Sequence, residues 1–174
     1  MFVEVSTGDT DKRVLVPRDI LPDHIVGLVE SLYSLGGRAD PMHIGDLTGE
    51  SIALLPKVID VAETLGLVKY ENGYLTLEEP GRKVAEADPK RLRKLLRELV
   101  IEKKVEPLHE IYEMLVKRKS IPRGELTRVI EKHYKRMDEG VARNILVWGA
   151  YLGMFKLSED DSEVVLLASP RSKG

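Results

Sequence analysis

Residues 65–77 read Leu65-Gly66-Leu67-Val68-Lys69-Tyr70-Glu71-Asn72-Gly73-Tyr74-Leu75-Thr76-Leu77, and this stretch decides the fold. Asn-Gly is the dipeptide that best tolerates the two left-handed residues of a type I′ turn. The runs on both sides are rich in apolar and aromatic residues, as strands are. The stretch therefore predicts an antiparallel β-hairpin with strands over residues 67–71 and 74–77.

Three runs with apolar residues at helical spacing precede this hairpin. The first begins near Asp23 and ends at a Gly-Gly pair, residues 36–37. The second begins at Asp40-Pro41, a good start signal because Asp caps free amides and Pro has none to lose. It ends near residues 47–49, and the third run begins near Pro56. Three helices followed by a two-stranded hairpin is the order of a winged helix-turn-helix unit.

The second half of the chain repeats this order. Helical patterns cover residues 107–118, 122–134 and 138–152, and strand-like runs at 154–157 and 164–167 flank an acidic loop. A shift of 87 residues aligns the halves without gaps and places the Leu-Gly step at 65–66 on that at 152–153. The predicted fold is mostly α with small β-hairpins, an α+β fold of tandem winged helix-turn-helix units joined by an amphipathic helix.

We divide the chain accordingly into five segments. The two repeats span residues 21–81 and 106–168, and a basic amphipathic helix within 82–105 connects them. Asp88-Pro89 begins that helix, which is expected to reach about residue 103. Strand-like runs at residues 2–5 and 13–16 predict a hairpin in an N-terminal extension, residues 1–20, and residues 169–174 are expected to form a flexible tail.

Charge is distributed unevenly, although Lys+Arg 27 against Asp+Glu 29 leaves a net charge of only −2. Residues 1–81 are strongly acidic, residues 82–123 are basic, and residues 124–174 are balanced. The candidate contacts to nucleic acid or to an acidic partner lie on the connecting helix: Lys90, Arg91, Arg93, Lys94 and Arg97. A solvated helix face is the plainer interpretation of such a stripe.

DNA binding is disfavoured by the charge of the two helices that would enter the major groove. The helix over residues 51–65 carries Lys57 as its one cation, and the second wing ends in Glu159-Asp160-Asp161, which phosphates would repel. Winged helices without basic reading heads commonly bind proteins. A protein partner, or a second copy of the chain, is therefore the preferred interpretation.

Several function classes are excluded or disfavoured by what the sequence lacks. With no Cys, it offers no disulfide, thiol catalysis or thiolate metal site. It contains no Gly-rich phosphate loop and no G-x-S-x-G elbow. His109 and Glu113 lie one helical turn apart, but no further ligand follows from the pattern. We therefore expect no catalytic residue, no cofactor and no metal, and a protein that is not an enzyme.

The composition also bears on location and source. The longest uncharged stretch, residues 144–155, is too short to span a bilayer, and no basic leader with an apolar run begins the chain. A cytoplasmic protein without membrane insertion is expected. The chain has no Gln and two Asn, while 32% of its residues are charged, a bias typical of heat-adapted proteins. A thermophilic source is therefore expected.

The chain also resembles a known family. The resemblance rests on structural segments: residues 21–28, 36–40, 54–56, 62–66, 75–77 and 85–88, and more loosely 148–151. It covers about 145 residues and is to the AAA-associated C-terminal domain, which follows the ATPase of some nitrate/sulfonate/taurine-type ABC transporters. It implies an accessory or regulatory domain without catalysis. Only about 20 residues precede it here, so a stand-alone copy could act in trans on an ABC-type ATPase.

Two hypotheses from different classes result. The first is a non-enzymatic regulatory or protein-interaction module, with an ABC-type ATPase or a second copy of the chain as partner. The alternative is a DNA-binding transcriptional regulator that uses the basic connecting helix as a dimer. The two differ in salt response, because phosphate contacts weaken steeply as salt rises.

Overall fold

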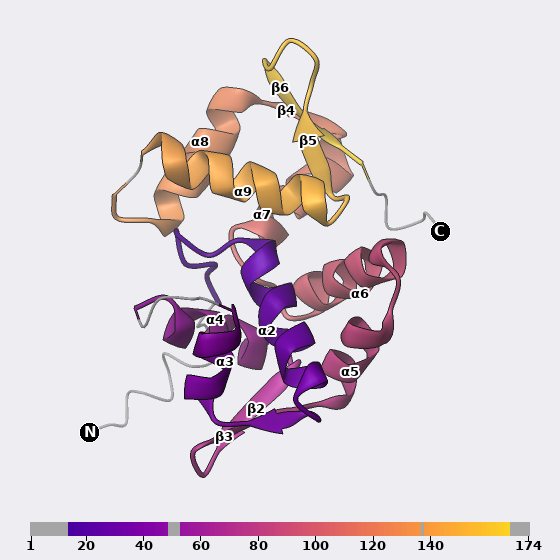
Figure 1. Ribbon diagram of the computed structural model, residues 1–174. Coiled ribbons are helices and arrows are strands. Elements are labelled where there is room, and N and C mark those ends of the chain that lie inside the picture. The colour runs from indigo at the N-terminus through magenta and orange to yellow at the C-terminus, as the bar shows by residue number, and fades with distance from the viewer. Residues whose placement is uncertain (1–13, 49–52, 137, 168–174) are drawn as a thin grey trace, which may run out of the picture.

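The computed structural model describes residues 14–48, 53–136 and 138–167. Its first half holds three helices and three strands (Figure 1). In chain order these are α2 (Pro22–Ser34), β1 (Arg38–Ala39), α3 (Pro41–Thr48), α4 (Leu55–Thr64), β2 (Val68–Glu71) and β3 (Tyr74–Leu77). The three helices lie where the apolar periodicity predicts them.

The second half repeats this order after two connecting helices. The connection consists of α5 (Glu79–Glu86) and α6 (Pro89–Glu102). The repeat consists of α7 (Leu108–Arg118), β4 (Ser120–Pro122), α8 (Arg123–His133), α9 (Glu139–Tyr151), β5 (Phe155–Leu157) and β6 (Glu163–Leu166). Figure 1 shows the halves above one another, with α6 lying beside both.

Each half contains a three-stranded antiparallel sheet, and the strand orders are β1-β3-β2 and β4-β6-β5. The predicted first hairpin is confirmed: Glu71 pairs with Tyr74, and Asn72 and Gly73 have positive φ values of 55° and 84°. The predicted mixed α+β class is confirmed as well. The third strand of each sheet was not predicted, because β1 and β4 have only two and three residues and so show no periodicity.

The 87-residue shift holds at the level of backbone hydrogen bonds. At the end of α4 the amide of Leu67 donates to the Ala62 carbonyl at 2.9 Å, and at the end of α9 the amide of Met154 donates to the Gly149 carbonyl at the same distance. The residues between, Gly66 and Gly153, have φ values of 78° and 71°. Helix and hairpin are thus joined by the same left-handed turn in both halves.

The connection between the halves differs in part from the prediction. Helix α6 begins and ends within one residue of the expected helix, and Asp88 is its N-cap. Helix α5 was not predicted. Its Gly81 packs so closely on the first half that an added Cβ would lie 2.2 Å from the Leu67 carbonyl oxygen. Residues 1–13, which include the first strand of the predicted N-terminal hairpin, and the predicted tail at 169–174 lie outside the described residues.

A single apolar cluster contains buried side chains from both halves. Residues 14–21 are part of it, because Val16 and Ile20 are almost fully buried. This segment also accepts hydrogen bonds from the second half: Trp148 Nε1 donates to the Ile20 carbonyl at 2.8 Å, and Asn144 Nδ2 donates to the Arg18 carbonyl at 2.7 Å. We call residues 14–21 the strap. Among the described residues, none of the helices has the length and apolar character needed to cross a bilayer.

Candidate interaction surfaces

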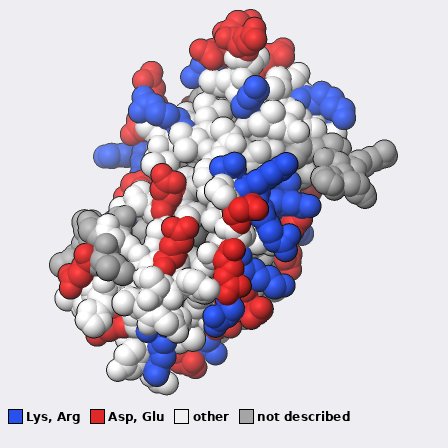
Figure 2. Space-filling model, turned by 45° about the vertical axis from the view of Figure 1, so that its right-hand side comes forward, with Lys and Arg blue, Asp and Glu red and all other residues white. Residues whose placement is uncertain are grey.

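Helix α6 presents the basic stripe that the sequence predicts. Asp88 Oδ1 accepts a hydrogen bond from the Arg91 amide at 2.8 Å, and Pro89 occupies the first turn, where no amide is needed. The side chains of Leu92, Leu96 and Val100 are buried, and most of the Lys and Arg residues of the helix face outward. Figure 2 shows Lys and Arg side chains gathered on the flank where Figure 1 places α6.

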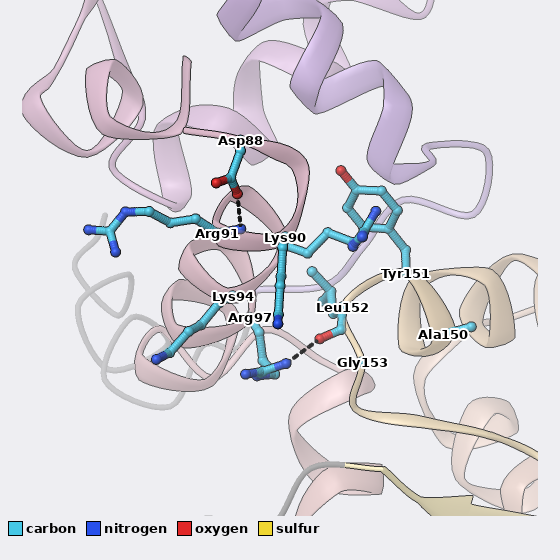
Figure 3. A pocket seen from close by; sticks show the side chains of 10 residues that line it. Asp88, Lys90, Arg91, Lys94, Arg97, Ala150, Tyr151, Leu152 and Gly153 are labelled. Atoms are coloured by element: carbon cyan, nitrogen blue, oxygen red, sulfur yellow. Dashed lines mark hydrogen bonds between the residues drawn. The ribbon is translucent and has the colours of Figure 1, made fainter. Parts of the chain in front are cut away.

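The five candidate residues of this stripe are not equivalent. Lys90, Arg91, Arg93 and Lys94 are exposed, whereas Arg97 is half-buried. Arg97 Nη1 donates to the Leu152 carbonyl at 2.9 Å, as Figure 3 shows. The guanidinium carbon of Arg93 lies 5.8 Å from the centroid of the Tyr151 ring. Arg93 and Arg97 therefore contact the end of α9, whereas Lys90, Arg91 and Lys94 are exposed.

Between α6 and the turn after α9 lies an open hollow of about 440 Å³, drawn in Figure 3. Burial raises the pKa of Tyr151 in its wall, an effect that the nearby Arg93 opposes. No carboxylate oxygen of the described residues lies within 4 Å of the charged nitrogens of Lys90, Arg91 or Lys94. The hollow thus has a positive rim.

Two further hollows lie on the third helix of each half. The α4 hollow, about 350 Å³, is lined by Pro41, Met42, Leu55, Pro56, Ile59, Asp60, Glu63 and Tyr70. The α9 hollow, about 470 Å³, is lined by Arg123, Glu139, Ala142, Arg143, Leu146, Val147, Ala150, Lys156 and Leu157. The 87-residue shift places Leu55 on Ala142, Ile59 on Leu146 and Tyr70 on Leu157, so the two hollows are repeat-related.

Both hollows have apolar floors but rims of opposite charge. Asp60 and Glu63 border the α4 hollow, and Met42 and Tyr70 beside them are 67% and 50% exposed. Arg123, Arg143 and Lys156 border the α9 hollow and outnumber its one acidic residue, Glu139. Exposed apolar side chains that gather in one place mark binding surfaces. Sequence reasoning missed these hollows, because each combines side chains from two helices with side chains from a strand of the neighbouring hairpin.

Three polar groups of α4, the first hairpin and α9 that could contact DNA have partners within the molecule. Lys57 Nζ lies 3.0 Å from Asp19 Oδ2, and Lys69 Nζ lies 3.6 Å from Glu71 Oε1. Asn144, the amide side chain on α9, donates to the strap.

The β5–β6 loop adds negative charge, which Figure 2 shows at the tip of the molecule. Hydrogen bonds from Ser162 and Ser158 lower the pKa of Asp160 in this loop, so its carboxylate stays charged. Phosphate groups would therefore meet repulsion at this tip.

The four histidines fall into different surroundings. His43 is exposed, and His24 Nδ1 accepts a hydrogen bond from the Leu21 amide at 2.9 Å. His109 lies between two carboxylates, and His133 lies 2.9 Å from a carboxylate oxygen of Glu110. The last two histidines come together with three glutamates, a cluster that the sequence did not predict because 23 residues separate Glu110 from His133.

The fold defines a mixed α+β protein that carries two repeat-related surface hollows and one basic helix. Residues 42–158 match the family of C-terminal AAA-associated domains, and the chain belongs to this family. The resemblance found in the sequence is thereby confirmed. The match includes α6, the α9 hollow and all of the α4 hollow except Pro41. No curated protein and no solved structure matches the chain.

Proposed function

We propose that this protein is a non-enzymatic accessory module of two winged helix-turn-helix units that regulates an ATPase by binding it. The order helix, strand, helix, helix, hairpin in each half supports the winged-helix assignment, as do the sheet orders β1-β3-β2 and β4-β6-β5. In such units the third helix is exposed for binding. Here these helices are α4 and α9.

The pair of repeat-related hollows carries the proposal. A DNA-reading helix presents donors and acceptors to base edges and cations to phosphates. Helices α4 and α9 instead present apolar floors, and exposed Met42 and Val147 border them. Apolar anchors in pockets are what protein partners use, whereas charged residues are depleted at the centre of such interfaces.

The family name indicates the partner. C-terminal AAA-associated domains accompany ATPases, and the chain belongs to that family. The occupant of the hollows is accordingly a surface segment of an ABC-type ATPase with apolar anchor residues. Because the rims are acidic at α4 and basic at α9, the two hollows suit two segments of opposite charge.

The test is a binding and turnover experiment with the full chain and the ATPase subunit of a nitrate/sulfonate/taurine-type transporter from the same organism. We expect stable association and a changed rate of ATP hydrolysis. Met42→Asp and Val147→Asp should each weaken binding at least about tenfold, equivalent to about 1.4 kcal/mol. Leu35→Asp is the matched control, since Leu35 is 40% exposed and lines neither hollow.

Unchanged affinity in both hollow variants would contradict the role of the hollows. Absence of any association, with turnover unaffected, would contradict the ATPase as partner. A concentration-dependent dimer that Met42→Asp disrupts would instead indicate a second copy of the chain as occupant.

A DNA-binding regulator is the second candidate function, and the three available cations on α6 favour it. If Lys90, Arg91 and Lys94 contact three phosphates, the affinity for DNA should fall about 40-fold as salt rises from 50 to 200 mM. Titration into labelled duplex measures this. Tight binding that Arg91→Glu and Lys94→Glu abolish would support DNA binding over the ATPase.

A further inference from the structure

We infer that the second half of the molecule holds a divalent transition-metal ion, with Zn²⁺ the best-fitting ion, between Glu106, Glu110 and His133. Ligand atoms of these three residues all lie within 4.8 Å of one another. Glu106 lies just before α7, Glu110 lies in its first turn, and His133 is the last residue of α8. Two donors thus come from α7 and α8, which lie in the upper half of Figure 1, and the third comes from the residues just before α7.

The geometry between the donors suits one small ion. His133 Nε2 lies 2.9 Å from Glu110 Oε1, and two ligands of one zinc ion are about 3 Å apart because each bond is about 2 Å long. Glu110 Oε2 is paired with Lys132, so Oε1 is the oxygen that faces the histidine. Glu110 would accordingly bind the ion through one oxygen and keep its lysine partner through the other.

The residues that line the hollow at the cluster all carry titratable groups. This open hollow of about 470 Å³ is lined by Glu106, His109, Glu110, Glu113, Lys132 and His133. With both imidazoles neutral, the lining carries three negative carboxylates and one positive ammonium group, a net charge of −2. A divalent cation would therefore balance the charge of the lining.

The burial of one donor makes the cluster more than a surface group of acids. The side chain of Glu106 is only 2% exposed, and its Oε1 accepts a hydrogen bond from the Glu110 amide at 3.0 Å. The other oxygen, Oε2, lies 3.5 Å from His109 Nδ1. The Glu110 amide and His109 thus hold the buried Glu106 carboxylate in place. Metal ligands are commonly oriented by such outer groups.

The donor types decide the class of ion. Carboxylate oxygens and imidazole nitrogens, without thiolates, suit Zn²⁺ and neighbouring first-row ions, whereas Mg²⁺ and Ca²⁺ prefer oxygen ligands alone. His109, with Nε2 3.4 Å from Glu113 Oε2, stands beside the three donors as an orienting group. The remaining coordination positions would be left to water.

The site would connect three parts of the chain. The Glu106 amide donates to the Val14 carbonyl at 2.6 Å, and the Val16 amide donates to the Glu106 carbonyl at 2.9 Å. An ion on Glu110 and His133 therefore ties α7 to α8, and its bond to Glu106 steadies the residue that is hydrogen-bonded to the strap. Its role is structural, and it does not depend on the proposed ATPase partner.

The test uses the full chain, free of any affinity tag and stripped with a chelator. Calorimetric titration with zinc chloride at pH 7 should give one ion per chain, and zinc should raise the melting temperature reversibly. Substitution with Co²⁺ should give an absorption spectrum distinct from that of aqueous cobalt. A spectrum identical to aqueous cobalt would overturn the inference without the use of any variant.

Two variants and one control locate the ion. His133→Ala and Glu110→Gln should each weaken zinc binding by more than the roughly 10- to 100-fold that loss of an outer-shell partner costs. His43→Ala is the matched control, because His43 is an exposed histidine in the other half. Circular dichroism verifies that each variant is folded. Equal zinc affinity in His133→Ala, Glu110→Gln and His43→Ala, or no binding below about 100 µM in the unmodified chain, would overturn the site.

Discussion

In each half, a residue of the third helix and a residue of the following strand are buried at equivalent positions, and the two halves use different residues at these positions. In the second half an added Cβ on Gly149 would lie 2.2 Å from Cε1 of Phe155, so the helix residue must be glycine beneath that ring. The 87-residue shift places Ala62 and Val68 at the same two positions of the first half, and both are buried there. In the first half the helix residue is thus larger, Ala in place of Gly, and the strand residue is smaller, Val in place of Phe. The sum of the two volumes, and not either residue alone, is what the turn between helix and hairpin requires.

Gly149→Ala should therefore destabilise the protein by about 1–3 kcal/mol, although Ala is the better helix former, because the new methyl group meets the Phe155 ring. Phe155→Val alone should destabilise it by leaving a cavity. The double variant Gly149→Ala/Phe155→Val copies the first half and should be more stable than the sum of the single changes predicts. Urea unfolding of the unmodified protein, the two single variants and the double variant measures the coupling free energy between positions 149 and 155.

Gly124→Ala is the control for helix propensity. Gly124 lies in α8 with open space where a Cβ would be, so Ala should stabilise the protein there by about 0.5–1 kcal/mol. Strict additivity of the Gly149 and Phe155 changes would contradict the shared-volume argument.

At the scale of elements, helix α6 shows what local sequence can determine. Its start depends on Asp88 and Pro89, adjacent residues whose capping chemistry is complete within one turn, and the helix lies where that chemistry predicts it. Short strands are different. β1 and β4 form because β3 and β6 offer free edges, a condition set by residues 36 or more positions away.

The features of the candidate surfaces likewise divide into those that local sequence predicts and those that depend on tertiary packing. The exposure of Lys90, Arg91 and Lys94 follows from helix periodicity, and the sequence predicts it. The contact of Arg97 with the Leu152 carbonyl joins residues 55 apart, and periodicity has no information about it. The same holds for Glu110 and His133, since their approach depends on how α7 packs on α8. Local chemistry thus located the helices other than α5, while tertiary packing selected the distant partners of Arg97 and Glu110.

Replacing the cap of α6 tests the local part of this argument. Asp88→Ala should lower the free energy of unfolding by about 1 kcal/mol, because the Arg91 amide loses its acceptor. Asp88→Asn is the matched control: it removes the charge but keeps a capping oxygen, so stability should change by a few tenths of a kcal/mol at most. Thermal or urea unfolding measures both. An equal loss in Asn and Ala would assign the effect to charge and contradict the capping role.

At the scale of the whole molecule, the strap and α6 make the two halves dependent on each other. Each small sheet is built from short strands and would be marginal alone. The shared apolar cluster includes Val16 and Ile20 of the strap, whose carbonyl groups accept hydrogen bonds from Tyr134 Oη and Trp148 Nε1 of the second half. Arg97 adds a contact from α6 to the end of α9. Loss of structure in one half would expose apolar surface of the other.

The protein should therefore unfold in one cooperative transition, in spite of its internal repeat. Trp148 is the one tryptophan of the chain and lies buried in the second half, so its fluorescence reports that half, whereas far-ultraviolet circular dichroism reports helices of both. The two urea transitions should coincide in midpoint and slope, as two-state unfolding requires. Ile20→Ala should lower the midpoint of both signals together, with a loss of about 2–5 kcal/mol for a fully buried side chain. Two separated transitions, with Ile20→Ala shifting only one, would show that the halves fold independently and that the strap merely lies between them.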